Sequence, residues 1–168
     1  MKVFGIAGRS GAGKTTLLEK LVPELGSRGK LVSLIKHSHK HVDIDRPGKD
    51  SYRLRESGCK EVLLLGNDRW ALMHELRGQP EPRLDELLAR MQDCDIVLVE
   101  GFKEGNFPKL EVWRECVATS PLWPDLTGIK AIATDSVRQF EGVVSLQLTD
   151  VARIADFVLA HAQGVDAT

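Results

Sequence analysis

The sequence predicts an α/β protein whose mostly parallel central sheet lies between two layers of helices. Short apolar runs typical of buried strands alternate along the chain with longer segments of helical periodicity. A glycine-rich turn joins the first of these strands to the first helix. The chain has 168 residues, of which 42% are hydrophobic, and this is enough for a sizeable core. We therefore expect residues 1–168 to form a single domain.

The first expected strand, Lys2–Ala7, leads directly into a complete phosphate-binding loop. Residues 8–15 read Gly-Arg-Ser-Gly-Ala-Gly-Lys-Thr, which matches the pattern G-x-x-x-x-G-K-[ST]. The helix that follows begins near Lys14. One stripe of this helix is apolar and consists of Leu17, Leu18, Leu21 and Val22. Because the loop stands between a strand and a helix, the sequence predicts a three-layer P-loop NTPase fold that binds a nucleoside triphosphate.

The residue types in this loop suit a triphosphate and a magnesium ion. The glycines allow a tight turn in which backbone N–H groups face phosphate oxygens, and the helix dipole adds positive potential. Lys14 would reach the β- and γ-phosphates, and the Thr15 hydroxyl would bind Mg²⁺. The expected nucleotide contacts in the loop are Gly8, Arg9, Ser10, Gly11, Ala12, Gly13, Lys14, Thr15 and Thr16.

The remaining elements follow in alternation. The expected strands are 31–35, 61–65, 70–74, 95–99, 110–113 and 129–133. The expected helices are a short one from an Asp50 cap to residue 55, one carrying Leu84, Leu87, Leu88 and Met91, and one over 150–161. Ligands of such sheets bind at the carboxyl ends of the strands. Residues that directly follow a strand are therefore the candidates for chemistry.

The most apolar of these strands ends at Glu100 and Gly101. A carboxylate at this position is the usual second half of a phosphate-loop site, where it holds Mg²⁺ directly or through water. We expect Glu100 to be a metal ligand and, with Lys14, a catalytic residue. Gly101 would let the backbone approach the phosphates closely. A solvated glutamate at a strand end is the alternative.

Residues 36–45, Lys-His-Ser-His-Lys-His-Val-Asp-Ile-Asp, form an unusual polar segment. In an extended conformation His37, His39 and His41 share one face, which Asp43 and Asp45 continue. Three interpretations stay open: contacts to the nucleotide, its Mg²⁺ or a second anionic substrate, with Asp45 as a metal ligand; a transition-metal site; or a solvated loop. The two cations of residues 46–51 favour an anionic partner.

Asp135 follows the strand 129–133 and is the candidate for base recognition. A carboxylate there can accept two hydrogen bonds from N1 and N2 of guanine, which adenine does not supply. The familiar guanine motif Asn-Lys-x-Asp is absent from the chain. An aspartate that caps the next turn is therefore the alternative.

Composition excludes several classes of protein. A formal net charge of −1 argues against a broad nucleic-acid surface. No apolar stretch approaches the roughly 18 residues of a membrane span, so we expect no membrane association of that kind. Cys59, Cys94 and Cys116 lack a C-x-x-C spacing, which suits reduced thiols in the cytoplasm. We expect all three to be buried small residues.

Three segments together resemble the MobB family of molybdopterin-guanine dinucleotide biosynthesis adaptor proteins. They are the phosphate loop with its following leucines, residues 35–51, and Leu-Val-Glu-Gly-Phe-Lys at 98–103; residues 109–114 also match the family. The resemblance implies a GTP-binding protein with weak hydrolysis that forms a homodimer. It also implies that the protein assists the nucleotidyltransferase that joins GMP to molybdopterin. Whether molybdopterin itself contacts this chain stays open.

Two other classes compete with this interpretation. A kinase for a small metabolite would need an acceptor pocket and an arginine-bearing lid, and no segment can be assigned clearly to such a lid. A GTP-driven metallochaperone would bind metal tightly at His37, His39 and His41.

Overall fold

The computed structural model describes residues 1–38, 42, 44–102, 105–117 and 119–164. The chain divides into two compact units. Unit 1 comprises Met1–His37 and Leu87–Thr168, and unit 2 comprises Ser38–Glu86.

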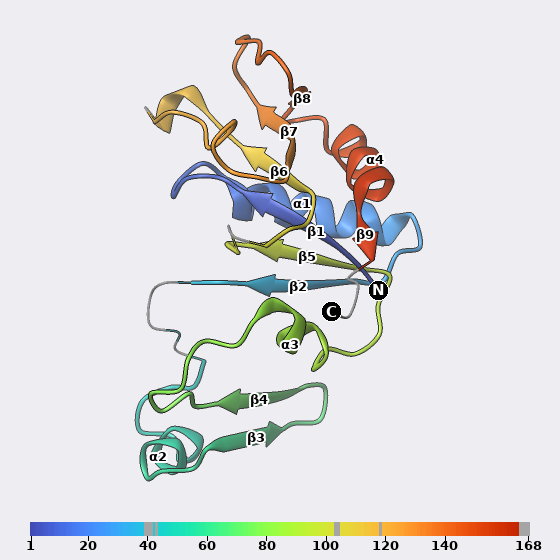
Figure 1. Ribbon diagram of the computed structural model, residues 1–168. Coiled ribbons are helices and arrows are strands. Elements are labelled where there is room, and N and C mark those ends of the chain that lie inside the picture. The colour runs from blue at the N-terminus through green and yellow to red at the C-terminus, as the bar shows by residue number, and fades with distance from the viewer. Residues whose placement is uncertain (39–41, 43, 103–104, 118, 165–168) are drawn as a thin grey trace. The chain divides into compact units, whose positions relative to one another are not determined.

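A seven-stranded sheet forms the centre of unit 1 (Figure 1). Its order is β2-β5-β1-β6-β7-β8, and each neighbouring pair in this order is parallel. The short β9 pairs antiparallel with β1. In the order of the sheet, the strands are β2 (Val32–Lys36), β5 (Ile96–Glu100), β1 (Lys2–Ala7), β6 (Lys109–Val112), β7 (Ile129–Thr134), β8 (Val144–Gln147) and β9 (Gln163–Gly164). The predicted mostly parallel α/β fold is confirmed.

Two helices cover one face of this sheet, α1 (Lys14–Ser27) and α4 (Val151–His161). Phe4 and Ile6 alternate along β1 toward that face, where they share one core with side chains of both helices. The opposite face is covered near β1, β6 and β7 by irregular chain, because Ala7 packs against Leu122 and Ile129. The core therefore fixes β1, and with it the start of α1.

The helix α4 matches its predicted range to within one residue, whereas the cap of α2 and the end of α3 differ from the prediction. Asp150 caps α4 by accepting a hydrogen bond of 3.0 Å from the backbone of Arg153. In α2 (Asp50–Glu56), however, Asp50 is the first helical residue and Lys49 occupies the cap position, so the expected Asp50 cap is wrong. The expected helix as far as Met91 is too long. The element α3 (Leu84–Leu88) ends where backbone hydrogen bonds to the third preceding residue tighten the chain into a turn.

Unit 2 contains a separate two-stranded antiparallel sheet of β3 (Glu61–Leu65) and β4 (Trp70–His74). Both strands were expected, but they do not belong to the parallel sheet. A connection of residues 66–69 suits only a hairpin, since parallel neighbours need a long crossover. The turn is closed by a 2.9 Å hydrogen bond from Gly66 N–H to the Arg69 carbonyl.

The cysteines are not the buried residues that the sequence suggested. Cys59 and Cys116 are exposed, Cys94 is half-buried, and all three are free thiols. Cysteine is often buried, but burial depends on where the residue lies in the fold. Both exposed cysteines lie outside strands. Within the described part of the chain, no helix has both the length and the apolar character to cross a membrane.

Candidate nucleotide-binding site

The phosphate-binding loop joins β1 to α1 in a backbone conformation that requires glycine. Gly8 has φ +144°, and a Cβ atom there would lie 2.5 Å from the carbonyl oxygen of Val112. Gly13 has φ +97° and accepts the first hydrogen bond of α1, from Leu17 N–H at 2.9 Å. The loop is thus seated against the end of β6, and the helix N-terminus opens toward it.

Lys14 folds back over this loop. Its Nζ donates hydrogen bonds of 3.0 Å to the carbonyl of Gly8 and 3.1 Å to that of Arg9. The same ammonium lies 3.9 Å from Oε1 of Glu100. The next residues, Thr15 and Thr16, are exposed on the first turn of α1, where a hydroxyl can reach a metal ion. Ser10 and Gly11 are exposed and Ala12 is buried in the core.

Glu100 ends β5 between two lysines. The parallel register places it beside Lys36 of β2 and Ile6 of β1. Lys36 Nζ lies 3.1 Å from Glu100 Oε2, and Glu100 is only 7% exposed. Oε2 is buried and, apart from this ion pair with Lys36, makes no hydrogen bond with any described residue. This carboxylate therefore keeps acceptor capacity at the carboxyl ends of two adjacent strands, where a water ligand of Mg²⁺ would fit.

Gly101 brings the ends of β2 and β5 into backbone contact. Its φ is +105°, and a Cβ atom there would lie 2.7 Å from the carbonyl oxygen of His37. His37 N–H in turn donates to the Glu100 carbonyl at 2.8 Å, and the His37 ring lies 4.8 Å from that of Phe102. A small pocket of about 20 Å³ opens beside this contact. Its lining includes Gly8, Lys14, Gly101, Phe102 and Lys109.

Asp135, the candidate for base recognition, directly follows β7 and pairs with Arg114. Arg114 Nε donates to Asp135 Oδ2 at 2.7 Å, and this hydrogen bond raises the pKa of the guanidinium. A Cβ atom on Gly13 would lie 4.0 Å from Arg114 Cδ, so the arginine stem borders the phosphate loop. Arg114 therefore links the base candidate to the loop. Sequence analysis had assigned it no role, although it also follows a strand.

Two charged residues of β6, Lys109 and Glu111, are buried on the face of the sheet opposite α1 and α4. Glu111 accepts hydrogen bonds from the backbone N–H groups of Leu122 (2.6 Å) and Trp123 (3.0 Å). Burial raises the pKa of the Glu111 carboxyl, although these donors and the nearby Arg9 lower it. Lys109 Nζ donates to the carbonyls of Gly105, Phe107 and Thr127, and burial lowers the pKa of its ammonium. These side chains anchor irregular chain beneath the site.

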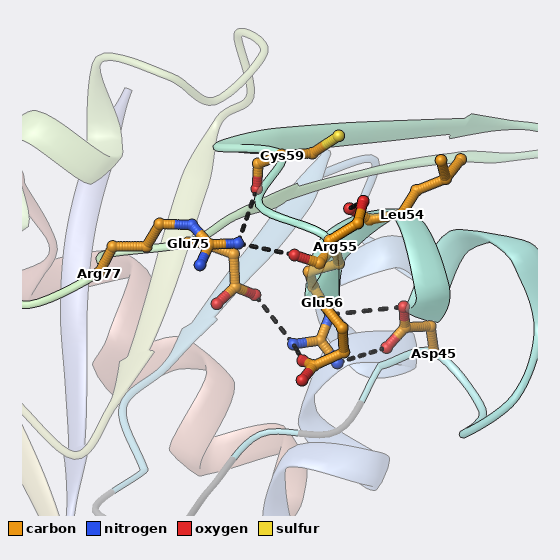
Figure 2. A network of polar contacts seen from close by, with 8 residues as sticks. Asp45, Leu54, Arg55, Glu56, Cys59, Glu75 and Arg77 are labelled. Atoms are coloured by element: carbon orange, nitrogen blue, oxygen red, sulfur yellow. Dashed lines mark hydrogen bonds and ion pairs between the residues drawn. The ribbon is translucent and has the colours of Figure 1, made fainter.

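Asp45 lies in unit 2, where it forms an ion pair. Arg55 donates to its carboxylate from Nη2 at 3.2 Å and from Nε at 3.5 Å (Figure 2). The side chains are 5% exposed for Asp45 and 11% for Arg55. His39, His41 and Asp43 lie outside the described residues. Among the residues that are described, no three His, Cys, Asp or Glu side chains gather as a metal site.

The structure thus unites most of the predicted site residues at one edge of the unit 1 sheet. The loop, Glu100 and Gly101 meet at the ends of β1 and β5, and Asp135 stands at the end of β7. Lys36 and Arg114 are additions that the sequence did not identify. Asp45 belongs to the other unit.

Comparison with known proteins agrees with this arrangement. Residues 3–135 match the family described as "MobB: Molybdopterin guanine dinucleotide synthesis protein B". A "Molybdopterin-guanine dinucleotide biosynthesis adapter protein" of Haemophilus influenzae is 42% identical over 160 residues, covering 93% of this chain and 86% of that protein. The protein of the same name from Escherichia coli is 41% identical over 165 residues, covering 96% and 93%.

Solved structures give the same result. A crystal structure titled "molybdopterin-guanine biosynthesis protein B (mobB)" superimposes with a TM-score of 0.72 and 25% identity, covering 94% of this chain and 98% of that one. The family match spans most of the chain and includes the phosphate loop, Glu100 and Asp135. The chain belongs to the MobB family and has its nucleotide-binding P-loop fold.

Proposed function

We propose that this chain is a GTP-binding adaptor that assists the nucleotidyltransferase joining GMP to molybdopterin, in the synthesis of molybdopterin guanine dinucleotide. The observation that carries the proposal is the site at the ends of β1 and β5, where Lys14 over a complete phosphate loop faces Glu100. Family membership supports the pathway, because the relatives named above are adapter proteins of this biosynthesis.

The proposed ligand is GTP with Mg²⁺. Lys14 would bind the β- and γ-phosphates, and the Thr15 hydroxyl would be a direct metal ligand. The buried Oε2 of Glu100, which is ion-paired with Lys36 but makes no hydrogen bond with a described residue, fits a contact to a metal-bound water. When bound, Mg²⁺ would neutralise charge on the phosphate oxygens. Asp45 would have to leave Arg55 to serve as a ligand, so Thr15 and Glu100 carry this part of the proposal.

Hydrolysis is proposed to be weak and accessory. The chain after Glu100 reads Gly-Phe-Lys-Glu-Gly-Asn-Phe-Pro and offers no glutamine to orient an attacking water. Glu100 itself lies between the ammonium groups of Lys14 and Lys36, which suits it to hold ligands in place. The bound nucleotide would then determine the conformation in which the protein binds the nucleotidyltransferase. We place the protein in the cytoplasm, because the free thiols of Cys59, Cys94 and Cys116 suit a reducing compartment.

We further propose a homodimer formed through one face of the β3–β4 hairpin. On this face Leu63 pairs with Leu72 and Leu65 with Trp70. All four side chains are exposed, by 59%, 46%, 75% and 57% in that order. A contiguous apolar face of this kind marks an interaction surface, and an isolated two-stranded sheet is only marginally stable. A second copy of the same face would cover it symmetrically.

Two experiments test the proposal. Tagged protein, as wild type and as Lys14→Ala, is used to capture partners from a molybdenum-replete cell. The nucleotidyltransferase should be retained by the wild type in the presence of GTP, and its absence would contradict the adaptor role. For the dimer, Leu65→Lys/Trp70→Lys should sediment as a monomer, whereas Val137→Lys, at a 94% exposed position of unit 1, should not change the oligomer.

A further inference from the structure

Unit 2 contains an open hollow that the proposed GTP site does not use. Its volume is about 390 Å³, within the range of pockets that hold small organic ligands. One wall is the hairpin face opposite the exposed one and consists of Leu64, Ala71 and Met73. The other wall is the segment that enters α2 and consists of Ile44, Asp45, Arg46, Lys49, Asp50 and Ser51. The hollow thus has an apolar side and a charged side.

The charged side carries an excess of positive charge. Asp45 is neutralised by Arg55 at 3.2 Å, and Asp50 lies 3.9 Å from Arg53. Arg46 and Lys49 are both exposed, and neither has an ion-pair partner among the described residues. Two cations on one short turn, next to a hydroxyl at Ser51, form a suitable receptor for a phosphate group.

This turn is flanked by a half-buried network of polar contacts (Figure 2). Arg55 joins Asp45, which precedes the turn, to Glu75, which follows β4, with an Nη1 to Oε1 distance of 3.2 Å to the glutamate. Arg77 donates to the carbonyls of Arg55 and Cys59, at 2.6 and 3.2 Å. Within the turn, Lys49 N–H donates to the Arg46 carbonyl at 3.2 Å. The backbone that carries the two cations is therefore held beside the hairpin, which lowers the cost of bringing them to a ligand.

We propose that this hollow binds a small organic phosphate. A flat heterocyclic ring would pack on Leu64, Ala71 and Met73, and its phosphomonoester would lie between Arg46 and Lys49. The inference rests on the proposed function in one respect: a pterin that is to be joined to GMP as a dinucleotide must carry a phosphate of its own. Unit 2 would thus bind the second substrate of the partner enzyme, and unit 1 would bind GTP.

The test uses flavin mononucleotide as the probe and riboflavin as its match without the phosphate. Binding to the full chain is followed by fluorescence anisotropy. Arg46→Gln/Lys49→Gln should weaken flavin mononucleotide binding at least tenfold. The matched control is Arg69→Gln, an exposed cation of the hairpin turn outside the hollow, which should change binding less than twofold. Wild type should bind riboflavin at least tenfold more weakly than flavin mononucleotide.

Two further arms separate this proposal from the GTP site. Lys14→Ala and saturating GTP should both leave flavin mononucleotide binding unchanged; loss in either would place the probe in the phosphate loop and overturn the inference. Equal affinities of Arg46→Gln/Lys49→Gln and Arg69→Gln would overturn it as well. A wild type that binds the probe but not GTP would support this site while contradicting the proposed function. Circular dichroism of each variant checks that the fold is retained.

Discussion

Lys36 and Glu100 face each other across the boundary of β2 and β5, with Nζ 3.1 Å from Oε2. Their strands are separated by more than fifty residues of sequence but are neighbours in the sheet, and the register sets the two residues side by side. Glu100 consequently divides its charge between Lys36 and Lys14. The proposed metal site is therefore tuned by a residue outside the phosphate loop.

Replacing this lysine should strengthen the hold on magnesium. In Lys36→Gln the Glu100 carboxylate loses its nearest cation and is freer to accept from a metal-bound water. The Mg²⁺ concentration needed for half-maximal GTP binding should fall severalfold, as measured by titrating Mg²⁺ at fixed GTP. Lys20→Gln, a lysine on α1 outside the site, provides the control. An unchanged or higher midpoint would show that the Lys36 pair does not compete with the metal.

Lys14→Ala should abolish triphosphate binding and leave the fold intact. The lysine is a charge-assisted donor in a preorganised cradle, so its loss should cost about 2–4 kcal/mol of binding free energy. Calorimetric titration with GTP measures the effect, and thermal unfolding of the variant serves as the control. Retention of wild-type affinity would mean that the loop has only a structural role.

Intrinsic GTP hydrolysis should be slow, in the unassisted range of about 10⁻⁴ to 10⁻² s⁻¹. Glu100→Gln should slow turnover further and weaken its dependence on Mg²⁺, while GTP binding without metal survives. Single-turnover assays with and without Mg²⁺ give both quantities. A rate of several per second for the isolated wild type would refute the first expectation, and unchanged turnover in the variant would assign the metal to another carboxylate.

GTP should be preferred over ATP through Asp135. A carboxylate placed to accept from guanine N1 and N2 gains no such hydrogen bonds from adenine, a difference of roughly 1–3 kcal/mol in binding free energy. Asp135→Ala should therefore lower GTP affinity and narrow its advantage over ATP in competition binding. Arg114→Ala should do the same to a smaller degree, since it removes the 2.7 Å hydrogen bond that orients the carboxylate. A preference that persists in both variants would place base recognition elsewhere.

Stability should depend on pH through Glu111. Burial raises the pKa of this carboxyl in the folded protein, so the folded state favours the protonated form more than the unfolded state does. Stability then falls as pH rises from the ordinary glutamate value near 4.3 through the raised folded value. The wild type should lose stability relative to Glu111→Gln as the pH rises above the ordinary glutamate value, as measured by urea unfolding. If the difference in unfolding free energy between the wild type and Glu111→Gln stays constant as the pH rises, the raised pKa of Glu111 is contradicted.

Local signals predicted the parts of the fold that depend on one segment. The phosphate-loop motif and hydrophobic periodicity predicted the loop, the strands β1 and β5 and the helix over 150–161, and the structure has each of them. The strand β8 was missed. It has only four residues, and Val144 at its start is exposed, so it lacks the continuous apolar character of an interior strand.

Features that depend on pairing between distant segments were beyond sequence analysis. Lys36 joins the site only because β2 lies next to β5, and Arg114 joins Asp135 only because β6 lies next to β7. Asp45 was expected to bind the metal because the histidine-rich segment begins at a strand end. Its ion pair with Arg55, which follows it by ten residues, was not foreseen. Strand order and the competition of nearby cations for one carboxylate decide these contacts.

The two hydrogen bonds from Lys14 to the carbonyls of Gly8 and Arg9 have a consequence for turnover of the ligand. An incoming phosphate must compete with these two hydrogen bonds for the Lys14 ammonium. The binding free energy that the phosphate gains from Lys14 is therefore a difference between two sets of interactions. When the nucleotide departs, the lysine can return to the carbonyls without leaving an unsatisfied charge over the loop. The affinity of the loop for phosphate would therefore depend on its carbonyl groups as well as on its N–H groups.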